Sequence, residues 1–446
     1  MHILKLFLFP TGISFLLCAF TVSQSLAAFT LEECVELALS NNPDLQKQQM
    51  NLNLAHAGLN EEKSRNFGSL NIVSSYTHHN LPRTLTPMTP GLIMNDPTDV
   101  ATTEDLFAAG IIYELPLFTG FSQTRTIEVA ALQKKMAASA LKLSREQLIY
   151  NVKTLYVNIL SQQAQDKAQG AYVTALQRLH NDIIREVELG KKARIDELKA
   201  AADLKNGEAK KFQILANIKV MKAALASLLN VDRIPELQDI DLEAESIVAV
   251  EDNFMDQLER LQRLRAARLD IEKNTKLVEK VKGSFYPQIG LNTSYGQNFG
   301  PNDDSNKYDG DWENQEVWQA GLNLKWNIFD FGERGAQVQK AKIRERQSRH
   351  EQTKIKLELR RALQEAVTRI NTAVIDYDSA RAELDLTRET EAIEQIRFEK
   401  GAADINDLLY AKARNQLALS RFLKAEYSYK NGCFYLDYLL ENGENK

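Results

Sequence analysis

The sequence contains few of the residues that interrupt helices, with 20 glycines and 10 prolines in 446 residues. Charged residues make up 26% of the chain and are interleaved with alanine and leucine, which is typical of long helices rather than of a disordered chain. The formal net charge of −5 leaves no basic surplus, which argues against a nucleic-acid partner. We therefore expect a mainly helical protein, long enough for two domains of ~100–200 residues each.

Signatures of catalysis are also missing. The sequence has no G-x-S-x-G, no H-E-x-x-H and no phosphate-binding glycine loop, so we expect neither an enzyme nor a bound metal or cofactor. The six histidines are scattered, and the adjacent pair His78 and His79 is predicted to lie in an exposed loop. A disulfide between Cys34 and Cys433 is permitted outside the cytoplasm, but two unpaired thiols are the expected state.

The first 27 residues have the features of a signal peptide. A basic start containing Lys5 precedes a mostly apolar stretch, and Ala27 ends a small-x-small cleavage site. A retained membrane anchor is the alternative, and lipidation of Cys18 is disfavoured because Leu17 precedes it. Beyond this segment we expect no run of the ~20 apolar residues that a spanning helix needs, so a membrane crossing would have to use strands.

An internal repeat organises the rest of the chain. At an offset of 211 residues, Phe118 corresponds to Phe329 and Gly190 to Gly401. Between these anchors, apolar residues recur at spacings of four, three and four, which is a helical seam. The paired positions are Leu148, Val152, Leu155 and Ile159 with Leu359, Leu363, Ala366 and Ile370.

Each half is predicted to run helix, strand, loop, strand, long helix, hairpin tip and helix. We expect a first repeat over residues 28–231, an acidic linker over 232–252 and a second repeat over 253–446. The long helices should span residues 122–187 and about 334–400, roughly 100 Å each at ~1.5 Å per residue. A coiled-coil rod or adhesive stalk would share this helix length.

Four strands are expected at about 68–79, 105–118, 285–297 and 315–329, with exposed loops between the members of each pair at about 82–97 and 300–304. Apolar residues alternate with polar ones from Trp318 to Ile328, so one face of the strand is apolar. Trp318 and Trp326 are roughly 26 Å apart at ~3.3 Å per residue, close to the ~25 Å apolar band of an outer-membrane barrel. The predicted girdle aromatics are Phe107, Tyr113, Trp318 and Trp326. An ordinary half-buried strand in a soluble sheet is the alternative.

Four strands cannot close a barrel, because the smallest known barrels have ~8. An open sheet edge in lipid would leave backbone groups unpaired, at several kcal/mol each. We therefore expect oligomerisation. Three copies would supply twelve strands and an open lumen, whereas two copies would supply eight strands and a filled interior.

The order and spacing of several motifs resemble the TolC family of outer-membrane efflux proteins. They comprise residues 31–38, 42–45, 116–120 and 285–287, together with the two glycine-centred tips. The resemblance implies a mainly α fold with β: a homotrimer whose twelve-stranded β-barrel in outer-membrane lipid continues as a long α-helical barrel through the periplasm. It implies a passive exit duct for tripartite efflux or type I secretion, working with a periplasmic adaptor and an inner-membrane transporter. The cargo, whether drug, metal or polypeptide, stays open.

The resemblance also implies a periplasmic gate at the last hairpin, where the family has Tyr-x-x-Gly-x-Arg followed by two Asp. Here Phe398 stands at the Tyr position, Ala403 at the Arg position and Asp407 at the first Asp position, while Tyr410 replaces the second Asp. The full set of predicted gate residues is Asp196, Phe398, Asp404, Asp407 and Tyr410. The predicted adaptor contacts at the tips are Gly190, Lys191, Lys192, Gly401 and Ala402.

The family's Arg-to-Asp link cannot form here as such, and Lys191, Lys192 or Arg194 is the expected substitute. Three copies of Asp407 facing one axis would repel each other and attract cations. The alternative is that Asp407 is a solvated residue at a helix N-terminus, where acidic side chains are favoured in any case.

Overall fold

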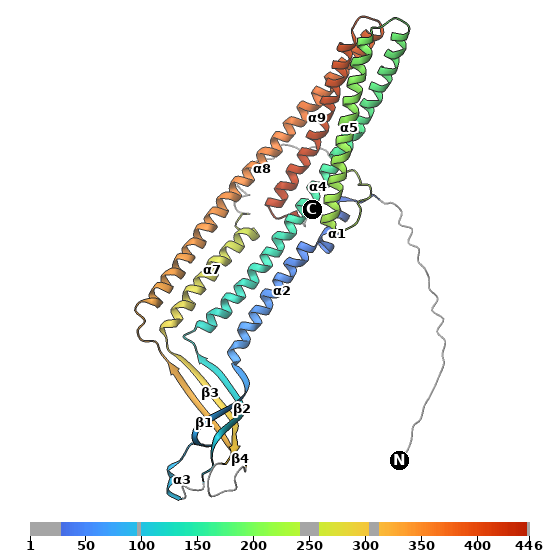
Figure 1. Cartoon of the computed structure of the whole chain (residues 1–446). Helices are drawn as coiled ribbons and strands as arrows, with labels where there is room; N and C mark the ends of the chain where they lie inside the picture. Colours follow the sequence, from blue (N-terminus) through green and yellow to red (C-terminus); the bar gives the residue numbers. More distant parts are fainter. Residues whose placement is uncertain (1–27, 96–99, 241–257, 303–311, 444–446) are drawn as a thin grey trace, which may run out of the picture.

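The computed structural model describes residues 28–95, 100–240, 258–302 and 312–443. The chain is elongated, with a four-stranded sheet at one end and the tips of two helical hairpins at the other (Figure 1). The predicted signal peptide lies outside the described residues, as do residues 241–252 of the predicted linker. At the N-terminal end of the described chain, Phe29 pairs with Leu237 of the linker in an isolated β-bridge.

The two halves contain matching series of elements. The first half consists of α1 (Leu31–Asn41), α2 (Pro43–Ser64), η1 (Arg65–Phe67), β1 (Ser69–Thr84), α3 (Pro90–Asn95), β2 (Thr102–Phe118), α4 (Ser122–Glu188) and α5 (Arg194–Leu229). The second consists of α7 (Gln262–Lys282), η2 (Gly283–Phe285), β3 (Gln288–Pro301), β4 (Trp312–Lys325), α8 (Glu333–Glu399) and α9 (Ile405–Leu439). Helices α4 and α8 have 67 residues each and begin at equivalent positions of the repeat.

The helices divide into two regions along the molecule. Near the sheet, α7 lies between α4 and α8, and α2 lies on the other side of α4 (Figure 1). Away from the sheet, α4 pairs with α5 and α8 with α9. The apolar seam predicted from the repeat is the buried side of both long helices: Val152 and Ile159 are fully buried in α4, and Leu363 and Ile370 are buried in α8.

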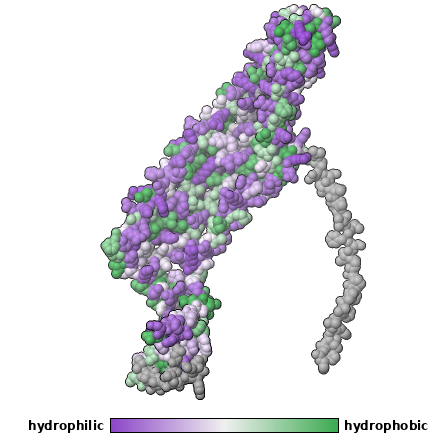
Figure 2. Space-filling view, in the orientation of Figure 1, coloured by the Kyte–Doolittle hydropathy of each residue, from purple (hydrophilic) through white to green (hydrophobic). Residues whose placement is uncertain are grey.

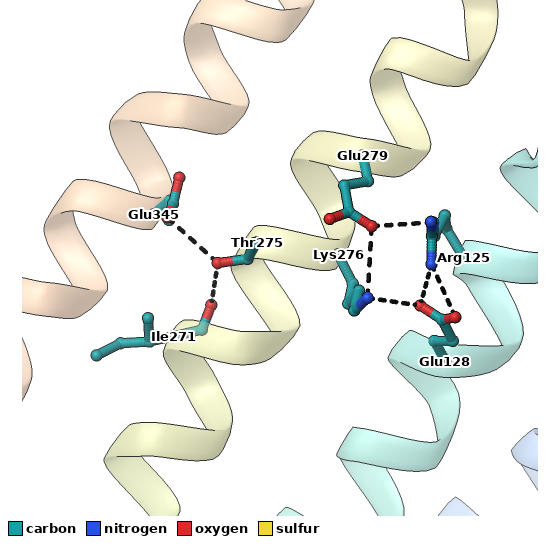
Figure 3. A network of polar contacts seen from close by, with 7 residues as sticks. All are labelled: Arg125, Glu128, Ile271, Thr275, Lys276, Glu279 and Glu345. Carbon is teal, nitrogen blue, oxygen red and sulfur yellow. Dashed lines mark hydrogen bonds and ion pairs between the residues drawn. The ribbon is translucent and has the colours of Figure 1, made fainter.

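Polar contacts fix α7 between its neighbours (Figure 3). Arg125 of α4 pairs with Glu279 of α7 at 2.9 Å, and Lys276 of α7 pairs with Glu128 of α4 at 3.1 Å. On the other side of α7, the hydroxyl of Thr275 donates to Glu345 of α8 at 3.2 Å. The start of α7 is capped from beyond the end of α9, because the backbone N–H groups of Gln262 and Arg263 donate to the carboxylate of Glu441.

The four strands form one antiparallel sheet in the order β1-β2-β3-β4. Its register places side chains of like character opposite one another. Ile72, Ile111, Tyr295 and Trp318 form a continuous cross-strand row on one face. The next row, Asn71, Ile112, Ser294 and Gln319, lies on the other face. One face of the sheet is therefore mainly apolar, interrupted by the row of Ser74, Ala109, Gln297 and Glu316, and the other face is mainly polar.

Strand ends differ from the sequence expectation in several places, and each of β2, β3 and β4 begins three residues from its expected start. β1 continues to Thr84, past its expected end at about residue 79. His78 and His79 therefore lie inside the strand and not in the exposed loop that was also expected for them, and His78 Nδ1 is 2.8 Å from the Asp105 carboxylate across the pair. β3 includes Gly300 and Pro301, which were expected in the following loop. Conversely, β4 ends at Lys325, so Trp326 follows the strand instead of belonging to it.

The two cysteines among the described residues, Cys34 and Cys433, are free, and Cys34 is fully buried among the helices. Burial raises the pKa of its thiol to about 12. The expectation that no later segment is apolar enough to span a membrane needs correction for α5. One 18-residue window in this helix passes by length and composition, with 17% of it buried.

A buried polar contact links the two hairpins. In α4, the side-chain amide of Gln169 donates to the carbonyl of Gly207 in α5 and accepts from Gln416 of α9, both at 3.0 Å. Gln169 and Gln416 are both buried, between the apolar cluster near the tips and the one near α1. The contact holds α4, α5 and α9 in one register.

The Gln169→Leu variant should lower the free energy of unfolding by about 1–3 kcal/mol, because the buried amide of Gln416 loses its acceptor. Thermal unfolding followed by circular dichroism would show this as a lower Tm. The double variant Gln169→Leu/Gln416→Leu is the matched control and should recover most of the loss, because no buried side-chain amide is then left unpaired. A Gln169→Leu Tm equal to that of the wild type would contradict this account.

Candidate functional site: the hairpin tips and the barrel wall

The two hairpins turn with the same backbone geometry. Gly190 and Gly401 follow the long helices with φ of 70° and 71°. In the first turn, the N–H of Lys191 donates to the carbonyl of Glu186; in the second, the N–H of Ala402 donates to that of Arg397. This is the Schellman arrangement, which requires a left-handed residue after the helix and so favours glycine.

An apolar cluster shared by both hairpins joins their tips. Its buried members are Leu176, Leu179 and Ile183 of α4, Ala200 and Leu204 of α5, and Ile405, Leu408 and Leu409 of α9. Phe398 packs against this cluster, and the ammonium of Lys192 lies 4.1 Å from the centre of its ring. This cation–π contact crosses from one hairpin to the other. The two tips of one protomer are thus held together by apolar packing and by Lys192.

The acidic residues at the tips begin helices. Asp404 is the N-cap of α9: its carboxylate accepts from the N–H of Asp407 at 3.0 Å, and the Asp407 carboxylate accepts in return from the N–H of Asp404 at 3.4 Å. These bonds form a capping box. The backbone N–H of Asp407, followed by the Asn406 amide, holds the pKa of Asp404 below its usual value. Asp196 lies in the first turn of α5 and is half-buried.

Within one protomer, the contacts of Asp407 are therefore those of a solvated acidic residue at the N-terminus of a helix. Asp407 is exposed and Tyr410, one turn further along α9, is 67% exposed, so both are open to other copies. Among the described residues, no ion pair joins Lys191, Lys192 or Arg194 to Asp196 or Asp407. The described residues also contain no group of three or more His, Cys, Asp or Glu side chains placed to hold a metal ion.

The predicted girdle aromatics do not lie at one level of the sheet. Trp318 stands in the row with Tyr295, and Phe107 lies two rows beyond it on the same face, nearer the end of the molecule. Tyr113 and Trp326 lie toward the helices. The hydroxyl of Tyr113 donates to the carbonyl of Phe67 at 2.8 Å, and the indole N–H of Trp326 donates to that of Phe285 at 3.1 Å.

Sequence reasoning missed the partners of these aromatics. Phe107 belongs to a four-ring cluster with Tyr76, Phe299 and Trp312, whose ring centres lie 4.7, 5.5 and 5.2 Å from its own. Two further ring clusters lie at the junctions between the strands and the helices. One consists of Phe118, Phe121 and Tyr286, and the other of Phe329 and Phe331. Alternating aromatic residues in each strand were the available signal, but only the register brings them together.

The helices expose apolar side chains on faces that no described element covers. In α8 these are Ile343, Leu357, Ile375, Leu386 and Ile393, each a near-whole number of helical turns from the next. In α5 they include Leu198, Phe212 and Val220. Apolar patches along the helices and at the tips are visible in the space-filling view (Figure 2). Stripes of this length are typical of surfaces that bind another protein.

Comparison with known proteins identifies relatives of this architecture. The sequence profile of the outer membrane efflux protein family matches residues 34–231 and again residues 255–436, once in each half. No curated protein sequence is significantly similar to the chain.

Solved structures share the fold over most of the chain. The CmeC outer membrane channel of Campylobacter jejuni is 18% identical with a TM-score of 0.78, and the match covers 93% of this chain and 86% of that one. VceC of Vibrio cholerae is 15% identical with a TM-score of 0.75, covering 92% and 96%. The open state of the MtrE channel of Neisseria gonorrhoeae is 16% identical with a TM-score of 0.72, covering 93% and 89%. The predicted internally duplicated, TolC-like fold is confirmed.

Gly401→Ala should destabilise the second tip by about 1 kcal/mol, because alanine is strained at a φ of 71° although its Cβ would meet no atom within 4 Å. Amide hydrogen exchange at the start of α9 would report the loosening. Gly401→Asn is the matched control and should behave like the wild type, because asparagine tolerates this conformation better. Equal exchange in Gly401→Ala and the wild type would show that the turn does not depend on its left-handed residue.

Proposed function

The chain belongs to the outer membrane efflux protein family, and on that premise we propose that three copies form one continuous exit duct from the periplasm through the outer membrane. The family consists of efflux channels rather than enzymes. The finer proposal is a passive duct whose twelve strands close a barrel in lipid and whose hairpins form a helical barrel in the periplasm.

The observation that carries the proposal is the sheet. It exposes an apolar row running from Ile72 to Trp318, while both of its edge strands, β1 and β4, lack a partner among the described strands. Lipid does not tolerate an unpaired edge, and water does not favour so much exposed apolar surface. Pairing β4 of one copy with β1 of the next satisfies both requirements. Three copies give twelve strands and leave room for a lumen.

The exposed helical stripes support the same assembly. In a ring of three, the uncovered faces of α8 and α5 would pack against neighbouring protomers. Protein contact accounts for the apolar window of α5 without placing that helix in lipid, because its apolar side chains would then be buried between copies. The long helices α4 and α8, which follow the strands, would continue the wall of the duct away from the membrane.

The hairpin tips are the proposed periplasmic entrance. Asp407 and Tyr410 are exposed beside the capping box, and threefold symmetry would bring three copies of each around the axis, with Asp196 and Asp404 near them. Carboxylates at close range attract cations, and their mutual repulsion opposes closure of the entrance. The contact of Lys192 with Phe398 would help hold the two hairpins together against this repulsion. Opening would be an outward shift of the hairpins.

We assign the proposed adaptor contacts to the outermost residues of the turns, Gly190, Lys191, Gly401 and Ala402, together with Lys192. The exposed backbone of two glycine turns and two neighbouring lysines offer hydrogen-bonding groups and positive charge to a periplasmic adaptor. An energised inner-membrane transporter would then supply the cargo, in either a tripartite efflux or a type I secretion system. The duct itself contributes no energy.

The purified mature protein should migrate as a heat-modifiable trimer and conduct ions in planar lipid bilayers. A barrel spanning the bilayer gives discrete, lasting conductance steps, whereas an exported coiled-coil stalk gives none. The matched control is the Ile72→Glu/Trp318→Glu variant, which places charge on the apolar face and should not insert. A water-soluble wild-type protein without conductance would overturn the proposed function.

The Asp407→Ala variant tests the proposed gate. We expect block of the channel by a multivalent cation added at the periplasmic side to weaken at least about tenfold in the apparent blocking constant, because three facing carboxylates are lost. Asp385→Ala, an exposed acidic residue well away from the α8 tip, is the control and should leave block unchanged. Undiminished block in Asp407→Ala would refute the gate assignment while leaving the duct intact.

A further inference from the structure

The polar face of the sheet carries very few charges over the part nearer the helices; Glu313, opposite Gly300, lies on the same face farther out. Going along the strands from the helices toward the far end, its first rows contain mainly asparagine, serine, glutamine and glycine. Between the row of Gln288 and the row of Gln315, only two of the described residues on this face are charged, and they have opposite signs: Glu114 and Lys325. This face lines the lumen if the apolar face contacts lipid, so this inference rests on the proposed function.

Glu114 has open surroundings. It stands in the row Ser69, Glu114, Asn292 and Gly321, in which its neighbours are small or uncharged. A Cβ added at Gly321 would meet no atom within 4 Å, so the row is open at Gly321. Glu114 is exposed and takes part in no ion pair among the described residues. Its carboxylate is therefore presented to whatever passes along this face.

Lys325 lies nearer the helices, in the row with Gln288. Along β4 it is four residues from the row of Glu114, about 13 Å at ~3.3 Å per residue. Lys325 is also exposed and forms no ion pair with any described residue. A separation of 13 Å exceeds the ~10 Å Debye length at 0.1 M salt, so the two charges act on passing ions largely independently.

We propose that Glu114 and Lys325 form two rings of opposite charge in the lumen and set the ion preference of the barrel. In the trimer, three carboxylates would lie at one level and three ammonium groups at another. The Glu114 ring attracts cations and hinders anions, and the Lys325 ring does the opposite. Charged cargo would meet the Lys325 ring on leaving the helical part and the Glu114 ring before leaving the cell.

Reversal potentials in a potassium chloride gradient test the two rings. Glu114→Gln should lower the ratio of potassium to chloride permeability at least about twofold, and Lys325→Gln should raise it by a similar factor, because three like charges are removed in each case. Glu316→Gln is the matched control. Glu316 is an exposed acid in β4 on the opposite face, beside Gln297, and its removal should leave the ratio unchanged.

The shifts should persist in the Asp407→Ala background, because the gate lies at the other end of the molecule. If wild-type channels conduct but the Glu114→Gln and Lys325→Gln variants keep the wild-type ratio, the charge rings are refuted and the duct stands. If the wild type does not conduct, the proposed function fails and the rings fail with it. A shift in Glu316→Gln equal to that in Glu114→Gln would show that the two faces are assigned wrongly.

A variant that fails to assemble can be replaced by modification after assembly. Glu114→Cys channels treated with a positively charged methanethiosulfonate reagent should become less cation-preferring, and a negatively charged reagent should restore the preference. Wild-type channels treated in the same way are the control, because Cys34 is buried and only Cys433 is partly accessible. No response of Glu114→Cys to either reagent would place residue 114 outside the lumen and overturn the proposal.

Discussion

Unpaired backbone hydrogen-bonding groups at the two edges of a small sheet are the constraint on which the rest of this molecule depends. β2 and β3 are paired on both sides, whereas β1 and β4 each have one free side among the described strands. In lipid each unpaired group costs several kcal/mol, and in water the exposed apolar row from Ile72 to Trp318 would favour aggregation. In the proposed assembly, neighbouring copies complete the sheet. The exposed apolar stripes of α5 and α8 likewise favour burial against other copies along the helices.

Because the chain is internally duplicated, few copies are needed to complete the sheet. Each protomer supplies two strand pairs and two hairpins, so the proposed trimer would have six near-equivalent units around one axis. The two halves are most alike in the packed helices α4 and α8, which have the same length and bury their apolar seams in the same way. Their equivalence is weakest at the tips, where Lys192 of the first hairpin contacts Phe398 of the second. The two halves thus differ most at the proposed entrance, where the two unlike hairpins would move together on closing and apart on opening.

Some features could be predicted because local rules decide them. The absence of proline and the apolar spacing predicted both long helices to within one or two residues, and the single glycines predicted both tips. Strand ends were predicted less well, because nothing local stops a strand. β1 extends past His78, which contacts Asp105 of the paired strand, and β4 ends before Trp326, whose indole bonds to Phe285 from outside the strand. Such contacts depend on register, which alternation alone does not define.

By itself, the sequence determined the helical and strand periodicities, the repeat and the two glycine turns, because each follows from residues adjacent in the chain. The tertiary structure alone decided which side chains share a row or a buried contact. It grouped Phe107 with Trp312, placed Gln169 against Gln416, and set Glu114 and Lys325 on one face of the sheet. The physical reason is that these contacts join residues far apart in sequence. Their formation depends on the register between strands and between helices, which the whole fold settles together.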